Sequence, residues 1–311
     1  MAPRHYTSVL DLSRAETLEV LQRAAKLKAR WNSDRKASKR LRGCTLATIY
    51  EKPSLRTRVT FEAGMTQLGG HSIYLGPDDI QIGKREPAAD IARNLSRWVQ
   101  IIMARSFSHR TVTELAEYSS VPVINGLSDL EHPCQALADF LTLQESFGNL
   151  TGKKLAYVGD GNNVTHSLML MGALLSVHVA VATPEGYEPH RPVVERAQEL
   201  AAQTGATVSI THEPREAIQG ADAIYTDVWA SMGQETEAET RRSIFASYQV
   251  TPELMAATGK AETIFMHCLP AHRGEEVTAD VIDGPQSAVI DEAENRLHAQ
   301  KALILWLLRK N

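Results

Sequence analysis

The chain has 311 residues, of which 43% are hydrophobic and 23% charged, so it is long enough for a substantial core and for two domains. Its formal net charge of −4 provides no basic field, and we expect no nucleic-acid partner. Three scattered cysteines exclude a disulfide framework and a Cys-x-x-Cys metal site, as is typical of a reducing compartment. The first twenty residues carry charges throughout, and the longest apolar run, 302–308, is too short to span a bilayer. We therefore expect a cytoplasmic protein with no membrane partner.

Apolar segments alternate with helical patterns along the whole chain, which favours parallel sheets flanked by helices. In the first half, strands are expected at 44–50, 72–75, 99–104 and 121–124, and helices at 55–68, 87–97 and 111–118. A helix at 133–147 connects the halves. In the second half, strands are expected at 154–158, 177–182, 207–210, 223–226 and 263–266, and a last helix at 291–309. Long polar loops are expected at 76–86, 230–240 and 269–276.

The predicted fold class is α/β, with two similar-sized domains that are each a parallel sheet flanked by helices. The predicted boundaries are 1–133 for the first domain, 134–149 for the connecting helix and 150–290 for the second domain. Open parallel sheets bind ligands beyond the carboxyl ends of their strands. The active site is therefore expected in the cleft between the domains.

The segment Ser54-Leu55-Arg56-Thr57-Arg58 lies where an expected strand turns into a helix. Ser54 is a good N-cap, and the N–H groups of the first helical turn converge there with two guanidinium groups and two hydroxyls. This pattern predicts a site for a phosphate. A capped surface helix with solvated arginines is the structural alternative for this segment alone.

Polar residues follow several other expected strands, where ligands of parallel sheets bind. These residues are Arg105, His132, Cys134, Gln135, 159–163, Asp227, Ser231, Met232, Gly233, His267 and Cys268. Taken alone, His132 is a capping histidine, Asp227 a turn cap, Cys268 a small core residue and Arg296 a surface charge. Their recurrence at successive strand ends favours a shared function.

Five motifs occur together in the order and approximate spacing of one known family: the phosphate segment, His-Pro-Cys-Gln at 132–135, Asp227 with Ser-Met-Gly at 231–233, His-Cys-Leu-Pro at 267–270 and Glu-Asn-Arg at 294–296. On these motifs the whole chain resembles the aspartate/ornithine carbamoyltransferase family. Ser-Met-Gly and His-Cys-Leu-Pro are similar to the ornithine branch, because the aspartate branch carries His-Pro-Leu-Pro in the latter place. The resemblance implies an enzyme that transfers the carbamoyl group of carbamoyl phosphate to the δ-amine of L-ornithine, giving L-citrulline and phosphate. The sequence leaves open whether the reaction runs in this direction for arginine biosynthesis or backwards to yield carbamoyl phosphate.

The resemblance implies a carbamoyl phosphate site in the first domain. There the first helical turn at Ser54, Leu55, Arg56 and Thr57 holds the phosphate. Arg105 bridges the phosphate and the carbonyl oxygen, and His132 donates to that oxygen as charge develops. The carbamoyl amide is bound by Gln135 and by the backbone carbonyls of Cys268 and Leu269. Arg296 reaches the same substrate, which places the C-terminal helix, 291–311, on the first domain.

The resemblance also implies an ornithine site in the second domain. Asp227 accepts from the α-ammonium group, and Asn163, Ser231 and Met232 hold the head of the zwitterion. Cys268 lies beside the reacting amine, and its part in proton transfer is left open, as is the role of His267, which can brace a cis-type turn at 269–270. No metal or organic cofactor is implied.

Two further features follow from the comparison of motifs. Leu55 stands where many family members have Thr, so one hydrogen bond of about 0.5–1.5 kcal/mol is absent. Gln81, in the 76–86 loop, is similar to a family residue that reaches the site of a neighbouring subunit. A homotrimer, or a multiple of trimers, is therefore expected.

Three other functions compete with this interpretation. Gly159-Asp160-Gly161 is typical of a dinucleotide-dependent dehydrogenase, but Val164 stands at the third glycine position and no acidic residue follows the next strand. A non-catalytic binding protein would keep the fold, and Arg105, His132 and Cys268 argue against it. A sister enzyme would act on putrescine or an N-acylated ornithine. Asp227 discriminates, because these amines lack the α-carboxylate or the α-ammonium group.

Overall fold

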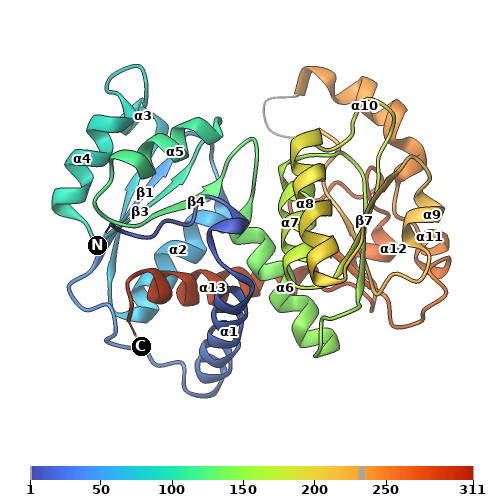
Figure 1. The fold of residues 1–311 in the computed structure, drawn as a ribbon, viewed down its shortest axis with the longest axis horizontal. Coiled ribbons are helices and arrows are strands. Elements are labelled where there is room, and N and C mark those ends of the chain that lie inside the picture. The colour runs from blue at the N-terminus through green and yellow to red at the C-terminus, as the bar shows by residue number, and fades with distance from the viewer. Residues whose placement is uncertain (1, 231–234, 311) are drawn as a thin grey trace. The chain divides into compact units, whose positions relative to one another are not determined.

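The computed structural model describes residues 2–230 and 235–310, which form two compact units. The first unit comprises Met1–Leu141 and Glu294–Asn311, and the second comprises Thr142–Ala293. Helices α6 (Pro133–Phe147) and α13 (Val289–Leu307) carry the chain from one unit to the other (Figure 1). Each unit has a parallel sheet flanked by helices, which confirms the predicted α/β class.

The sheet of the first unit has the strand order β2-β1-β3-β4, and all its strand pairs are parallel. The strands are β1 (Thr45–Tyr50), β2 (His71–Leu75), β3 (Ile101–Arg105) and β4 (Val123–Leu127). The helices of this unit include η1 (Val9–Asp11), α1 (Arg14–Asp34), α2 (Leu55–Leu68), α3 (Pro77–Ile80), α4 (Ala88–Trp98) and α5 (His109–Tyr118). The strand order reverses between β1 and β3, so ligands are expected beyond the carboxyl ends of these two strands.

Helices cover both faces of this sheet. Ile91 of α4 and Leu115 of α5 pack in one core cluster with Ile102 of β3. Figure 1 shows α4 and α5 on this face and α2 and α13 on the other. Gly64 of α2 allows α13 to approach closely, because a methyl group there would lie 3.3 Å from the Lys301 Cγ atom. This contact fixes α13 beside the helix that follows β1.

The sheet of the second unit has the strand order β7-β6-β5-β8-β9, again with parallel pairs. The strands are β5 (Lys154–Val158), β6 (His178–Ala182), β7 (Val208–Thr211), β8 (Ala223–Thr226) and β9 (Ile264–His267). The helices include α7 (Asn163–Leu174), α8 (Arg191–Thr204), α9 (Pro214–Ile218), η2 (Glu235–Glu237), α10 (Ala238–Phe245), η3 (Ala246–Tyr248), α11 (Pro252–Ala256) and α12 (Ala279–Ile282). Here the strand order reverses between β5 and β8.

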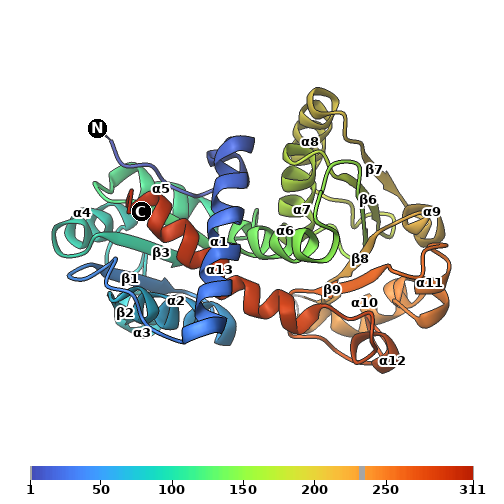
Figure 2. The same ribbon diagram turned by 90° about the horizontal axis from the view of Figure 1, so that it is seen from below.

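One core cluster of the second unit lies between the sheet and the helices α9 to α12. Ile224 of β8 and Phe265 of β9 belong to one cluster with Ile218, Phe245 and Met255 from three of these helices. Helices α7 and α8 lie side by side on the opposite face (Figure 2). Both faces are thus covered, as parallel sheets require.

Two expectations about loops and strands were wrong. The expected loop at 76–86 contains α3, which begins because the Asp79 carboxylate accepts a hydrogen bond of 2.7 Å from the Gly76 N–H group. The strand expected at 121–124 is β4, which runs to Leu127, because Tyr6 extends its pairing: the Asn125 N–H group donates to the Tyr6 carbonyl at 2.8 Å.

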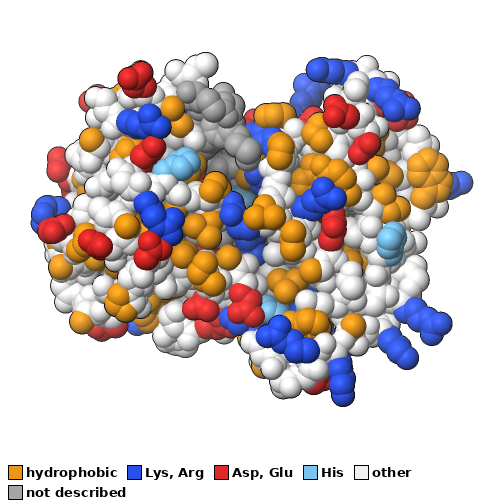
Figure 3. All heavy atoms as spheres, turned by 180° about the vertical axis from the view of Figure 1, so that it is seen from behind, with side chains coloured by type: hydrophobic (Ala, Val, Ile, Leu, Met, Phe, Trp, Pro, Cys, Tyr) orange, Lys and Arg blue, Asp and Glu red, His pale blue; other side chains and the backbone are white. Residues whose placement is uncertain are grey.

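The surface carries charges of both signs. On the face in Figure 3, Lys and Arg side chains are scattered among Asp and Glu side chains. Arg105 and Arg296, in contrast, are only 6% and 2% exposed, so their charge acts inside the first unit. Within 2–230 and 235–310, no helix combines the length and the apolar character that crossing a bilayer requires.

Candidate active site

Arg105 lies at the point where the strand order of the first sheet reverses. It is the last residue of β3, and it pairs with Tyr50 at the end of β1. The register with β4 shifts between Ala104 and Arg105, and such an irregularity re-aims the side chain that follows it. The buried guanidinium group therefore lies beside the segment that leads from β1 into α2, where the phosphate site was predicted.

The N-terminus of α2 has the predicted cap. The Ser54 Oγ atom accepts a hydrogen bond of 3.2 Å from the Thr57 N–H group, and Leu55 begins the helix with a side chain that is 74% exposed. Arg56 is half-buried. N–H groups of a first helical turn point out of the helix end, so this end can bind an anion.

Arg58 does not contribute to this point, and the expected convergence of two guanidinium groups was wrong. Its Nε atom donates to Glu62 at 3.0 Å, and its guanidinium group lies 3.8 Å from the centre of the Tyr74 ring. The reason is helical geometry, because residues two apart in a helix do not face the same side.

Arg296 supplies the second guanidinium group. It donates to the Thr57 hydroxyl at 2.8 Å and to the Gln135 Oε1 atom at 3.0 Å, and all three residues are buried. The Gln135 Nε2 atom in turn donates to the Asp139 carboxylate at 2.7 Å. This chain of hydrogen bonds holds the N-terminus of α2, the start of α6 and α13 in fixed positions. Asp139 was missed from the sequence, where it reads as an ordinary residue of a buried helix.

His132 lies just before α6 and is 4% exposed. Burial holds its pKa well below the usual value, and the positive charges of Arg296, Arg105 and Arg56 add to the effect. A neutral imidazole can donate one N–H group to a carbonyl oxygen without bringing another charge to a cationic site. The first unit thus collects Arg56, Arg105, His132 and Arg296 around one point.

Asp227 lies where the strand order of the second sheet reverses. It follows β8 directly and is 6% exposed. Its Oδ1 atom accepts from the Val228 N–H group at 2.8 Å and from the Cys268 thiol at 3.1 Å. Its Oδ2 atom accepts from the Asn162 side chain at 2.9 Å. The carboxylate is therefore fixed by the loops that follow β5, β8 and β9.

Asn162 lies in the 159–163 segment that the sequence placed after a strand, but its contact with Asp227 was not predicted. The expectation selected Asn163, which is the first residue of α7 and is half-buried. The Asn162 side chain both caps α7, accepting from the Val164 and Thr165 N–H groups, and donates to Asp227. Asparagine before a helix was a signal for the cap but not for the contact with Asp227.

Three further residues were predicted to belong to the site, namely Ser231, Met232 and Gln81. Ser231 and Met232 lie outside the described residues. Gln81 ends α3 with an exposed side chain and a left-handed φ of 44°.

Gly161 serves packing within the second unit. A Cβ atom at Gly161 would collide with the backbone of Glu188 and Pro189. The loop after β5 therefore lies against 187–189, where a dinucleotide-binding loop would need open space for a pyrophosphate. This contact argues against the dehydrogenase alternative.

Asp160 and Arg241 form a buried ion pair of 3.1 Å beside Asn162. Arg241 also donates to the Trp229 carbonyl at 2.9 Å and to Glu237 at 3.1 Å. The pair was missed because 81 residues separate its partners. It ties α10 to the loop that carries Asn162.

Asp160 gives a testable pH dependence of stability. Burial raises the pKa of its carboxyl group to about 6, although Arg241 opposes this shift. A folded pKa above the unfolded value means that the native state binds more protons, so this contribution to stability is full below about pH 4 and is lost as pH rises through 6. Urea titrations from about pH 4 to 7 should therefore show the unfolding free energy of the parent protein falling relative to Asp160→Asn. If the unfolding free energy of the parent protein minus that of Asp160→Asn stayed constant or rose with pH, this would contradict the raised pKa of Asp160.

The turn at 267–270 brings His267 and Cys268 close to Asp227 in the second unit. The Leu269–Pro270 peptide bond is cis, as the resemblance implies. Asp227, His267 and Cys268 bring one potential metal-ligand atom each within 4.8 Å of one another. However, the His267 Nδ1 atom accepts from the Leu269 N–H group at 2.8 Å, and its Nε2 atom contacts Glu276 at 3.2 Å. The ring therefore serves the loop rather than a cation.

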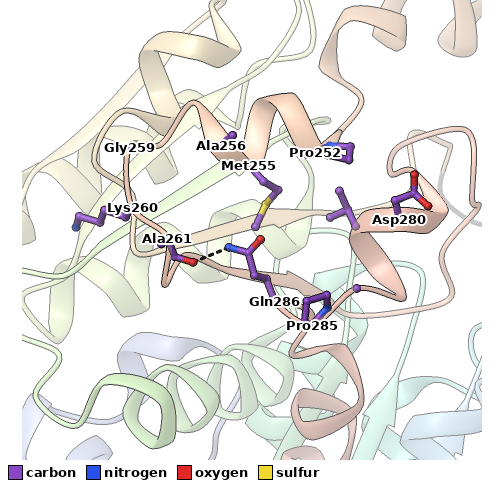
Figure 4. Close-up of a pocket in the computed structure, with 11 residues that line it drawn as sticks. Pro252, Met255, Ala256, Gly259, Lys260, Ala261, Asp280, Pro285 and Gln286 are labelled. Carbon is purple, nitrogen blue, oxygen red and sulfur yellow. Dashed lines mark hydrogen bonds between the residues drawn. The ribbon is translucent and has the colours of Figure 1, made fainter.

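A pocket of about 580 Å³ lies in the second unit away from these residues. Its walls come from α11, α12, the segment before β9 and the segment after α12, and they include Met255, Lys260 and Gln286 (Figure 4). The Gln286 side chain donates to the Ala261 carbonyl at 3.0 Å. This pocket lies at the amino end of β9, whereas Cys268 follows the carboxyl end, so it is separate from the candidate site.

Comparison with known proteins agrees with this geometry. Residues 4–145 match a family model described as the aspartate/ornithine carbamoyltransferase carbamoyl-P binding domain, and residues 151–307 match the Asp/Orn binding domain of the same family. An ornithine carbamoyltransferase from Thermococcus kodakarensis is 55% identical over 308 residues, which cover 99% of this chain and 97% of that protein. An anabolic ornithine carbamoyltransferase from Pyrococcus furiosus is 53% identical over 308 residues, with the same coverage of 99% and 97%.

Solved structures give the same result. The ornithine carbamoyltransferase of Pyrococcus furiosus has a TM-score of 0.93 at 53% identity, covering 98% of this chain and 96% of its own. That of Thermus thermophilus has a TM-score of 0.87 at 46% identity, covering 99% of this chain and 100% of its own. The chain therefore belongs to the aspartate/ornithine carbamoyltransferase family.

Proposed function

We propose that this protein is an ornithine carbamoyltransferase, which transfers the carbamoyl group of carbamoyl phosphate to the δ-amine of L-ornithine and releases L-citrulline and phosphate. The observation that carries this proposal is His132, a neutral imidazole buried among Arg56, Arg105 and Arg296. Such a site suits a dianionic substrate whose carbonyl must be polarised without protonation. The relatives named as ornithine carbamoyltransferases support the same reaction.

The first unit, with boundaries near 1–133 and 291–311, is proposed to bind carbamoyl phosphate. The N-terminus of α2 with Ser54, Arg56 and Thr57 holds the phosphate, and the backbone of Leu55 contributes an N–H group. Arg105 and Arg296 neutralise its charge. The carbonyl oxygen receives hydrogen bonds from Arg105 and His132, while Gln135 and the backbone of Cys268 and Leu269 orient the amide.

The second unit, near 150–290, is proposed to bind ornithine. Asp227 accepts from the α-ammonium group, because its carboxylate is buried and fixed by three donors. Asn163, Ser231 and Met232 hold the rest of the head group. Recognition of both charged groups would distinguish ornithine from putrescine and from N-acylated ornithine.

The chemical step needs no covalent enzyme intermediate. The neutral δ-nitrogen attacks the carbamoyl carbon, and the carbonyl electrons move onto the oxygen that Arg105 and His132 face. As the tetrahedral intermediate collapses, the bond from carbon to the phosphate oxygen breaks, and the proton of the attacking nitrogen passes to the departing phosphate. Catalysis then rests on orientation and on preorganised positive charge.

The protein is further proposed to act in the cytoplasm as a homotrimer or a multiple of trimers, with Gln81 reaching the site of a neighbouring subunit. Its exposed position at the end of α3 leaves the Gln81 side chain available for such a contact. Mixing Gln81→Ala with Arg105→Ala subunits tests this arrangement. Some activity should return if the two residues serve one site from different chains, and none if they belong to the same chain.

Substrate choice tests the proposed function directly. We expect ureido-product formation from carbamoyl phosphate with ornithine, and at most traces with putrescine, N-acetylornithine or aspartate. Putrescine lacks the α-carboxylate and N-acetylornithine lacks the α-ammonium group, so each leaves part of the ornithine site without its partner. Aspartate carries both groups but has no δ-amine to attack the carbamoyl carbon. Turnover with another amine in place of ornithine would keep the chemistry and overturn the substrate, and turnover with none would favour the binding protein.

A further inference from the structure

His267 is fully buried, and both of its ring nitrogens have partners within the second unit. The Nδ1 atom accepts a hydrogen bond of 2.8 Å from the Leu269 N–H group. An acceptor Nδ1 requires that the ring proton resides on Nε2. The Nε2–H group therefore donates to the Glu276 carboxyl group, 3.2 Å away. The two contacts together specify one tautomer and one orientation of the ring.

Glu276 is as buried as His267, with no exposed surface. The same Oε1 atom that contacts the imidazole also accepts from the His272 N–H group at 2.6 Å. This carboxyl group thus lies inside the loop from 267 to 276 and joins its two ends. A buried carboxyl group is costly unless it is hydrogen-bonded, so it fixes the loop in this arrangement.

The backbone of His267 has a second anchor. Its N–H group donates to the Glu292 Oε2 atom at 3.0 Å, and the Oε1 atom of Glu292 accepts from the Tyr225 hydroxyl at 3.2 Å. The start of the loop is therefore attached to β8 and to the N-terminal turn of α13. The ring contact with Leu269 lies beyond Cys268, so it bears on how the chain continues after that residue.

Leu269 needs such a contact, because its φ of 57° lies in the left-handed region that side chains other than glycine rarely adopt. Residues in this region persist where the surroundings hold them, and they cluster at functional sites. Between Leu269 and His267 stands Cys268, whose thiol donates to Asp227 at 3.1 Å. The position of this turn therefore sets the position of the thiol relative to the carboxylate.

We propose that His267 and Glu276 are positioning residues for the ornithine site: Glu276 selects the Nε2–H tautomer of His267, and the His267 Nδ1 atom then holds Leu269 so that Cys268 meets Asp227. Neither residue touches substrate. The expected effect on turnover rests on the proposed function, whereas the expected effect on the geometry of the turn does not.

Two pairs of variants test separately the two contacts of the His267 ring, with Leu269 and with Glu276. The amide oxygen of His267→Asn takes the place of Nδ1 and can accept from Leu269, whereas His267→Gln retains only the contact with Glu276. In the same way, Glu276→Gln retains an acceptor for the Nε2–H group, and Glu276→Leu removes it. Glu275→Leu is the matched control, because Glu275 is partly exposed and pairs with Arg242 at the surface.

The first readout is the alkylation rate of Cys268 by iodoacetamide without substrates, measured by peptide mass spectrometry. Cys44 is also half-buried but lies in the first unit, so it is an internal reference for general loosening of the fold. The ratio of the two rates should change severalfold in His267→Gln and Glu276→Leu. It should stay at the parent value in His267→Asn, Glu276→Gln and Glu275→Leu.

The second readout is steady-state kinetics with ornithine. A displacement of about 1 Å in a reacting group costs about 100-fold, so kcat/KM should fall by this order in His267→Gln and Glu276→Leu and by much less in their partners. The proposal is overturned if both members of a pair behave alike, or if activity falls while the Cys268 to Cys44 ratio is unchanged. A parent protein without turnover would instead refute the proposed function, and the alkylation ratios would still decide whether this positioning exists.

Discussion

Arg105→Ala is expected to lower kcat by about 10²–10³-fold, the usual effect of removing one donor from an oxyanion-stabilising site. Arg105 is buried at the end of β3, so water cannot replace its charge at the carbonyl oxygen. Arg105→Lys should recover part of the rate, since lysine supplies the charge but not the planar fork of donors. Steady-state kinetics with both substrates measures the effect.

The control for this prediction is Arg110→Ala, which removes an exposed guanidinium group of α5 from the same unit. It should leave kcat unchanged within error. Near-normal turnover of Arg105→Ala, in a variant that retains its thermal midpoint, would remove Arg105 from the proposed mechanism.

Asp227→Ala is expected to reduce kcat/KM for ornithine by about 30- to 150-fold, which corresponds to about 2–3 kcal/mol for a hydrogen bond to a charged group. The loss should appear in the use of ornithine and not in the affinity for carbamoyl phosphate, because Asp227 lies in the second unit and the phosphate-binding residues lie in the first. Kinetics with ornithine and calorimetric titration with carbamoyl phosphate separate the two effects.

Asp283→Ala provides the comparison, because this aspartate forms an exposed pair with Arg273 in the same unit. Exposed pairs contribute little, so its kinetics should match those of the parent protein. A similar loss in both variants, or a loss of carbamoyl phosphate binding in Asp227→Ala, would contradict the role assigned to Asp227.

Much of the fold could be predicted because local patterns and tertiary packing agree. The strands at 154–158 and 223–226 and the helices at 55–68 and 133–147 have the predicted bounds. Helix α1 was not predicted, because charges occur throughout its sequence and only a few residues, such as Val20, Leu21 and Ala24, are buried. Its capping box of Ser13 and Glu16 was the available signal.

The end of β4 shows why the first and last residues of a strand are harder to predict than the presence of the strand. Asn125 and Gly126 disfavour strands, yet both are part of β4. The Asn125 side chain donates to the Thr7 carbonyl at 2.9 Å, a partner 118 residues away. A Cβ atom at Gly126 would collide with the Met103 sulfur and lie 3.3 Å from the Ala104 carbonyl oxygen, so packing favours glycine there. Neither contact is visible in a local window of sequence.

The candidate site likewise contains residues that the sequence could predict and residues that it could not. Arg105 ends β3 and Asp227 follows β8 directly, so topology alone places them at the binding edge of each sheet. Arg296 is 239 residues from Thr57 and 161 from Gln135, and only the resemblance to a known family brought it to the site. Asn162, Asp160 and Glu276 act through contacts with other side chains, and the spacing of residues in a sequence does not reveal such contacts.

Carbamoyl transfer to ornithine is tested most directly by supplying carbamoyl phosphate labelled with ¹³C at the carbonyl carbon, together with ornithine, and following the label by NMR. We expect the label in the ureido group on the δ-nitrogen of citrulline, with one phosphate released for each label transferred. Label found on the α-nitrogen would contradict the proposed orientation of ornithine on Asp227. Phosphate release without a labelled ureido product would contradict carbamoyl transfer itself.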